Sequence, residues 1–142
     1  MSDVICPRSP REIMAGWVYL PRLVDKIRLH LAGKLHPDYQ ANFLAKGFDK
    51  LWFDRSGVNP DALVAVVNAS VTDGEVCDWV ARNAKGTEAD KAAHRDQLFA
   101  TGSENDPAIR ERLKTRKAQA GFAHRDDIQT FVDFIDADEK RL

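Results

Sequence analysis

Basic side chains gather in the first quarter of the chain, where they could bind an anion. Between Arg8 and Lys34 the sequence holds six arginines and lysines and only two acidic residues, which is an excess of four positive charges. On a helical wheel at about 100° per residue, Arg22, Lys26 and His30 form a ladder beside the apolar face of an expected helix. Arginine forks and a lysine ammonium at the border of a core suit a carboxylate or a phosphate. The candidate ligand-binding residues are Arg8, Arg11, Arg22, Asp25, Lys26, His30 and Asp127.

The same cations could instead form structural ion pairs. Arg22 and Lys26 are four residues apart, which is an ordinary spacing on a helix surface, and carboxylates from another helix would satisfy the whole row. Asp127 lies in line with the core-facing side of the last expected helix. There it could cap that helix or pair with a cation such as Arg22. The sequence leaves both interpretations open.

Sequence motifs of established chemistry are missing. The chain has no GxxxxGK[ST], GxGxxG, HExxH, GxSxG or paired CxxC. The four histidines are scattered without the spacing of metal ligands, so each is expected at or near the surface, and Cys77 is expected to be a buried, inert thiol. Asp133 and Asp136 indicate a solvated helix face more than a divalent cation site. We therefore predict no metal and no cofactor.

A second basic run covers residues 110–117, where five cations accompany Glu111. Such a run could contact phosphates. Aromatic residues for base stacking are not interleaved with it, however, and the acidic residues of 126–139 follow closely. We expect a solvated helix that contacts the acidic tail region, and we do not expect nucleic-acid binding.

Capping signals predict the helices that position these side chains. Ser, Thr, Asp or Asn stands before most of them, followed by Pro or by Glu three residues on. The expected helices cover residues 10–15, 20–34, 42–54, 60–69, 73–84, 88–100, 107–119 and 126–139. The valines of 60–69 would also suit a strand. The prediction is an all-α fold, a single-domain irregular bundle of seven to eight short helices.

Apolar faces divide the expected bundle into a centre and a flank. The broadest faces belong to helices 20–34, 42–54, 60–69 and 126–139, which should form the centre. Residues 86–124 have poor apolar stripes. We therefore expect the domain, residues 1–142, to carry 86–124 as a peripheral and more mobile helical flank.

The composition limits the classes of protein to consider. With 142 residues, 44% of them hydrophobic, and a net charge of −1, the chain can bury one core. No apolar run approaches the ~18 residues of a membrane span, and the mean hydropathy is −0.42. The first residues lack a signal-peptide pattern, and two distant cysteines fit a reducing compartment. These features predict a cytoplasmic protein without membrane contact.

Two stretches, one near each end, are similar to those of a known family. The first runs from Pro7-Arg8-Ser9-Pro10-Arg11-Glu12 through Leu20-Pro21-Arg22 and Asp25-Lys26 to Leu31-Ala32-Gly33. The second runs from Arg125 to Glu139 and includes Asp127-Ile128, Thr130-Phe131, Asp133 and Asp136. Together they resemble a bacterial domain of unknown function numbered five-zero-six-nine, although Phe131 stands where Trp is expected. The resemblance implies a small, soluble, mostly helical bacterial protein and, because the family has no assigned activity, no reaction.

The favoured function is binding of a small anionic ligand or partner in a cleft near Arg22 and Lys26. An alternative is an enzyme in which Asp25 or Asp127 is the general base and Lys26, Arg22 or Tyr19 stabilises developing charge. A further alternative is a helical interaction module that forms a homodimer. The residues considered for that dimer surface are Trp17, Trp52 and Phe53.

Overall fold

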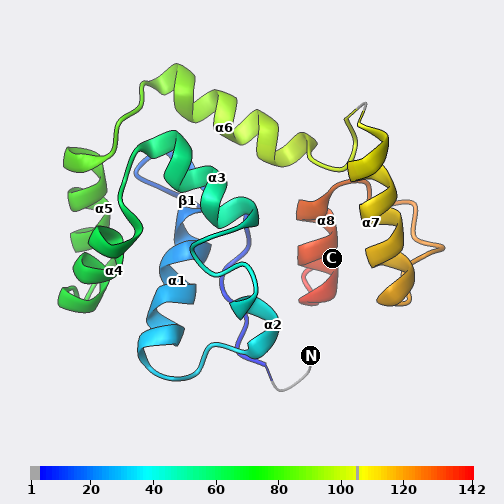
Figure 1. The fold of residues 1–142 in the computed structure, drawn as a ribbon, viewed down its shortest axis with the longest axis horizontal. Helices are drawn as coiled ribbons and strands as arrows, with labels where there is room; N and C mark the ends of the chain where they lie inside the picture. The colour runs from blue at the N-terminus through cyan, green and yellow to red at the C-terminus, as the bar shows by residue number, and fades with distance from the viewer. Residues whose placement is uncertain (1–3, 105) are drawn as a thin grey trace.

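Helices account for most of the chain. The computed structural model describes residues 4–104 and 106–142. Over these residues it has eight helices and one two-stranded antiparallel hairpin (Figure 1). In chain order the elements are β1 Ile13–Met14, β2 Trp17–Val18, α1 Leu20–Leu31, α2 Pro37–Gln40, α3 Gly47–Ser56, α4 Pro60–Ala69, α5 Asp73–Asn83, α6 Glu88–Ala100, α7 Pro107–Gln119 and α8 Phe131–Asp138. The predicted all-α fold class is confirmed, apart from the small hairpin.

Side-chain caps start the helices whose bounds agree with the prediction at both ends. Asn59 accepts hydrogen bonds from two backbone N–H groups at the start of α4. Thr87 forms a capping box at the start of α6, and Asp106 caps α7. Each cap satisfies N–H groups that have no partner inside the helix. Because 60–69 is the helix α4, the strand alternative for these valines is wrong.

Three predicted helix starts are wrong because left-handed backbone or a later cap intervenes. Residues 10–15 form a turn and β1, since Ala15 and Gly16 take φ values of 52° and 81° and reverse the chain into β2. Leu44, with φ 64°, interrupts the helix expected over residues 42–54, so that α3 starts only at Gly47. Thr130 forms a capping box with the first turn of α8, which therefore starts later than expected.

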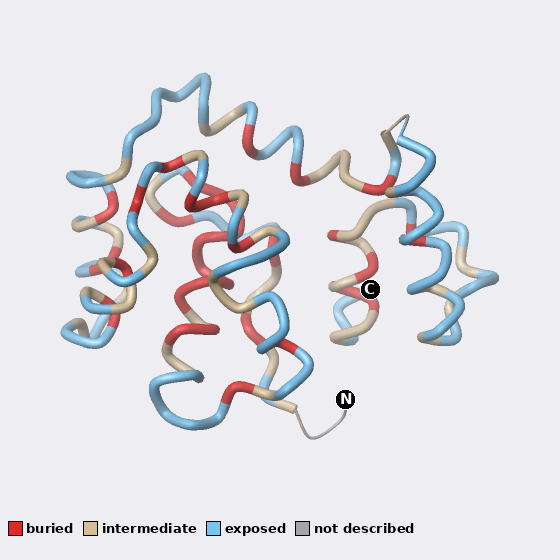
Figure 2. The backbone as a smooth tube through the Cα atoms, in the orientation of Figure 1, coloured by how far each residue is buried: buried red, intermediate tan, exposed pale blue. Residues whose placement is uncertain are grey.

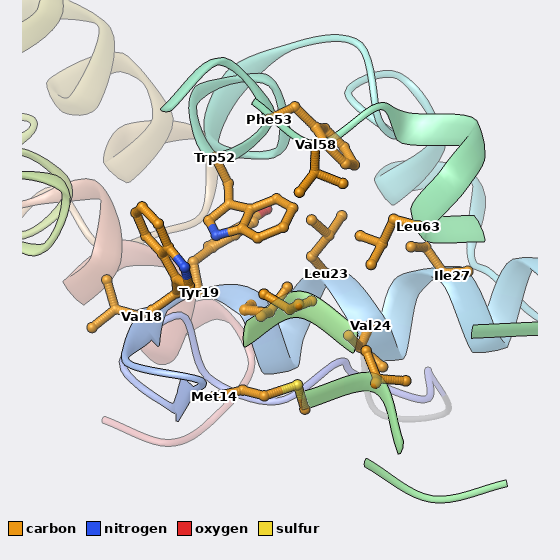
Figure 3. Packing of buried hydrophobic residues seen from close by; sticks show 14 of the residues in the cluster. Met14, Val18, Tyr19, Leu23, Val24, Ile27, Trp52, Phe53, Val58 and Leu63 are labelled. Atoms are coloured by element: carbon orange, nitrogen blue, oxygen red, sulfur yellow. The ribbon is translucent and has the colours of Figure 1, made fainter. Parts of the chain in front are cut away.

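Two tryptophans lie at the centre of the main core, against α1. The rings of Trp17 and Trp52 meet edge to face with centroids 6.1 Å apart. Figure 3 shows Trp52 in the same cluster as Leu23 of α1 and Leu63 of α4. The exposed fractions of Trp17, Trp52 and Phe53 are 1%, 0% and 6%. These three side chains therefore cannot form the dimer surface considered for them, because they are needed to fill the core. A homodimer through other residues stays a prediction.

The second half of the chain packs through its own apolar cluster. Leu113 of α7 and Phe134 of α8 share this cluster with Ile128 from the segment between them, while α6 leads to both helices from α5 along one edge of the molecule (Figure 1). Figure 2 shows α7 as mostly exposed, and Leu113 is its one buried residue. α6 is attached more firmly, because Leu98 on it is fully buried in the main core. The greater mobility expected of residues 86–124 stays a prediction.

His94 on α6 is fully buried rather than at the surface as expected. Its ring meets that of Trp17 edge to face, with centroids 5.5 Å apart. Burial, together with the nearby positive charge of Arg55, lowers the pKa of His94 from 6.5 to about 4. The folded protein therefore holds this imidazole neutral at pH values where an unfolded chain would protonate it.

The free energy of unfolding should consequently fall as the pH drops below 6.5. Between pH 6.5 and 4 the unfolded chain binds a proton at His94 that the folded chain does not, so stability is lost as pH falls. We expect this loss to reach about 3 kcal/mol at pH 4. Urea unfolding followed by tryptophan fluorescence at pH 7 and pH 4 measures it. His94→Phe, which keeps an aromatic ring, should lose about 3 kcal/mol less between these pH values, and equal losses would contradict the assignment.

Candidate functional site

A cleft of about 1270 Å³ separates the first helices from α7 and α8. Tyr19, Arg22 and Lys26 lie at its floor, at and just inside the start of α1, and all three are buried. α2 and the start of α3 form one wall, and the end of α6 forms the other together with α7 and α8. This volume exceeds the usual ~300–1,000 Å³ of small-molecule sites, so a small ligand would fill part of the cleft.

Tyr19 and Lys26 of this floor form a buried polar cluster with Asp49, which does not itself line the cleft; the exposed fractions of the three residues are 3%, 5% and 1%. The Tyr19 hydroxyl donates a short hydrogen bond to Asp49 Oδ1. Lys26 Nζ donates to the same oxygen at 3.1 Å and to Tyr19 Oη at 3.3 Å. Burial lowers the pKa of Lys26 despite the attraction of Asp49, and burial raises the pKa of Tyr19 well above its ordinary value. A cation and a proton donor are thus held side by side.

Unfavourable backbone conformations hold this cluster in place. Tyr19, with φ 76°, and Leu44, with φ 64°, both lie in the left-handed region that favours glycine. Tyr19 reaches Asp49 through its hydroxyl, and the Leu44 backbone N–H donates to Asp49 Oδ2 at 2.9 Å. Strain of ~1–3 kcal/mol per residue persists when the surrounding structure fixes it, and such residues concentrate at functional sites. Both strained residues here converge on one carboxylate.

Arg22 forms a buried, two-pronged ion pair with Glu139, just beyond α8. The two nitrogens of its fork donate to the two carboxylate oxygens at 2.8 and 2.7 Å. Glu139 also accepts from the Tyr39 hydroxyl at 2.8 Å and from Arg141 at 2.6 Å. Burial alone would raise the pKa of Glu139, but the hydrogen bonds and the charge of Arg22 hold that pKa below its ordinary value. This pair joins the floor of the cleft to one wall.

The arginines near the amino end bind carboxylates and do not line the cleft. Arg8 donates to both oxygens of Asp25, each at 2.9 Å, and to Asp73 at 2.8 Å. Arg11 donates to Asp133 at 2.5 Å and to Asp136 at 3.0 Å. Of the two interpretations left open by the sequence, Arg8 and Arg11 therefore fit structural ion pairing. The contacts of Arg11 hold the opening stretch of the family-like sequence against its closing stretch.

Three other candidate residues also lie away from the cleft lining. Asp25 is held by the Arg8 side chain and by the Arg8 backbone N–H at 2.9 Å, so as a general base it would face an arginine instead of a substrate. Asp127 is exposed and pairs with Arg125 at 2.6 Å. Of the two roles considered for Asp127, neither capping of α8 nor pairing with Arg22 occurs, because Thr130 caps α8 and Glu139 binds Arg22. His30 is exposed, with its ring 4.7 Å from that of Phe43.

The two carboxylates closest to the cleft chemistry, Asp49 and Glu139, were not among the candidates. On a helical wheel of 42–54, Asp49 lies opposite the apolar face, whereas the left-handed turn at Leu44 changes how that segment meets α1. Glu139 is the last residue of the family-like closing stretch, and that position was the available signal for it.

Other kinds of site receive no support from the described residues. Across residues 4–104 and 106–142, no group of three or more His, Cys, Asp or Glu side chains could hold a metal ion. Over the same residues, no helix has the length and apolar character needed to cross a bilayer.

The fold and the site define a small helical domain with an ion-paired cleft between its two halves. The family model described as Domain of unknown function (DUF5069) matches residues 5–141, so the chain belongs to this family. The resemblance drawn from the opening and closing stretches is confirmed. A comparison with curated proteins finds no match.

Proposed function

We propose that the cleft binds a small ligand that carries one carboxylate or phosphate group on an apolar body. The observation that carries the proposal is the Tyr19–Lys26–Asp49 cluster at the floor, held by strained backbone. A purely structural floor would be at least as stable with well-packed apolar side chains as with a buried ion pair. Ligand recognition at Lys26 and Tyr19 accounts for both the strain and the burial of charge.

The charges on the walls support a ligand with a single anionic group. Lys46 at the N-cap of α3 and Arg112 on α7 line opposite walls and form no ion pair with any described residue. Asp38 and Asp138 also line the cleft, and they would repel a polyanion. The ring of Phe48 on the α3 wall offers a surface for the apolar body.

A thermal-shift series tests this proposal with phenylacetate, phenyl phosphate and AMP as probes. A probe at ~100 times its dissociation constant should stabilise the folded protein by ~2.7 kcal/mol. Arg112→Gln should weaken the best probe, whereas Arg82→Gln is the control, because this exposed arginine lies on α5 and does not line the cleft. The proposal fails if no probe raises the melting temperature, or if both variants reduce the response equally.

An enzyme acting in the same cleft is the second candidate. It is favoured by the contact of Lys26, whose pKa is lowered, with the Tyr19 hydroxyl, since such a pair can move a proton at a bound substrate. Conversion of any probe during the thermal-shift series would support it, provided that Lys26→Met stays folded and abolishes the conversion.

We infer that this binding takes place in a reducing cytoplasm. Cys6 and Cys77 are both free thiols. Free thiols persist where the compartment is kept reducing. Such a compartment also supplies small organic carboxylates and phosphates as ligands.

A further inference from the structure

A second hollow, of about 450 Å³, lies on the other flank of α7. Arg110, Lys114 and Lys117 line it from the helix, whereas Arg112 and Arg116 line the cleft. At about 100° per residue, the two sets of cations point in directions about 150° apart. One short helix therefore presents positive charge to two separate concave surfaces.

The cations of this hollow have no acidic partner among the described residues. Arg110 and Lys114 form no ion pair there, and the described residues that line the hollow include no Asp or Glu. The basic run does contact the acidic tail region as expected, since α7 packs against α8, but no ion pair between described residues joins the two on this flank. Asp127, on the nearby loop, already accepts hydrogen bonds from Arg125 at 2.6 and 3.1 Å.

Lys117 is fixed in the wall without a carboxylate. Its ammonium donates to the backbone carbonyl of Arg125 at 2.6 Å and to that of Ile128 at 3.0 Å, and both bonds are partly buried. An ammonium has three N–H donors, so one remains for a ligand. The two carbonyl groups orient this ammonium but do not neutralise its charge. Because buried charges are usually paired with an opposite charge, Lys117 is suited to bind an anion.

The opposite wall of the hollow depends on a glycine. Gly102 has φ +105°, and a Cβ there would lie 2.9 Å from the Leu113 side chain and 3.2 Å from the Phe131 backbone nitrogen. Ser103 follows this glycine and also lines the hollow, and its hydroxyl donates to the backbone carbonyl of Ala100 at 2.9 Å. Leu113 and Ile128 contribute apolar surface. The lining of the hollow thus combines cations, a serine and an apolar surface.

We propose that this hollow binds the phosphate group of a small phosphorylated molecule. Three cations in a volume suited to one small ligand match a dianion better than a single carboxylate. Aromatic rings for base stacking do not occur among the described lining residues, which favours a small molecule over a single-stranded nucleic acid. The site is independent of the cleft, since the two share none of the described residues as lining.

Titration of the whole protein with inorganic pyrophosphate, followed by amide NMR, tests the proposal. Saturable shifts should map to residues 102–103, 110–118 and 123–129. Lys114→Gln should weaken binding at least ~10-fold, as expected for losing a charge-assisted hydrogen bond. Lys114 is exposed, so the variant should stay folded. Arg112→Gln, the matched control on the cleft flank, should bind pyrophosphate within ~2-fold of wild type.

Three outcomes would overturn the proposal. The first is the lack of any saturable shift, and the second is equal weakening by both variants, which would indicate nonspecific attraction to a basic helix. The third is tighter binding of a single-stranded RNA oligonucleotide that depends on both flanks of α7. The two sites share none of the described residues as lining. A failure of pyrophosphate to bind the hollow would therefore leave the thermal-shift response of phenylacetate in the cleft unchanged.

Discussion

Replacing Arg22 with methionine should lower the free energy of unfolding by about 3 kcal/mol, because the buried Glu139 loses its buried cation and keeps only the partly exposed Arg141. Glu139 would keep its hydrogen bonds from Tyr39 and Arg141 but lose the two-pronged contact at 2.7 and 2.8 Å. Chemical unfolding at pH 7, followed by the fluorescence of the buried tryptophans, measures the loss.

Two further variants separate pairing from general charge effects. Arg22→Met combined with Glu139→Met should recover at least half of the loss, because replacing both partners removes the uncompensated charge. Arg11→Met removes a pair whose arginine side chain is 43% exposed, so it should cost at most about 1 kcal/mol. If Arg22→Met and Arg11→Met lowered the free energy of unfolding equally, Arg22 and Glu139 would not form a buried ion pair.

Replacing Asp49 with asparagine should cost about 3 kcal/mol at neutral pH, and this cost should shrink as the pH rises. Burial already lowers the pKa of Lys26, and removing the attraction of Asp49 lowers that pKa further. The unfolded chain keeps its lysine protonated until about pH 10.4. Between the folded and unfolded pKa values the unfolded state binds the extra proton, so stability rises with pH.

Unfolding curves of Asp49→Asn at pH 7, 8 and 9.5 measure this recovery. The double variant Lys26→Met, Asp49→Asn is the control, because it lacks the titrating ammonium and should show no such recovery. A penalty that is the same at pH 7 and pH 9.5 would mean that Lys26 does not remain buried once Asp49 is lost.

Local sequence signals predict the bounds of the helices best where a side-chain cap acts alone. Asn59, Thr87 and Asp106 set the starts of α4, α6 and α7 through hydrogen bonds within a few residues. The predictions fail where a non-glycine residue takes a left-handed conformation, as Leu44 does, because its backbone N–H is claimed by a carboxylate. Propensity does not anticipate such a contact, since the energy that supports it comes from the folded surroundings.

The candidate site divides in the same way. The helical wheel places Arg22 and Lys26 correctly at the border of the core, because that position depends on α1 alone. It does not identify Glu139 and Asp49 as their partners, because those contacts span 117 and 23 residues of sequence. Pairing between distant residues is decided by packing, which a wheel of one helix does not contain.

The contacts between the opening stretch and α8 make the cleft a product of the complete fold. Ser9 and Arg11 meet Asp136 across 127 and 125 residues of chain, and closing so long a loop is among the slower and entropically more costly events in folding. The wall that α8 provides therefore exists only after distant segments have assembled. No excised fragment can reproduce the binding surface, and occupancy of the cleft would serve as a direct indicator of the native state.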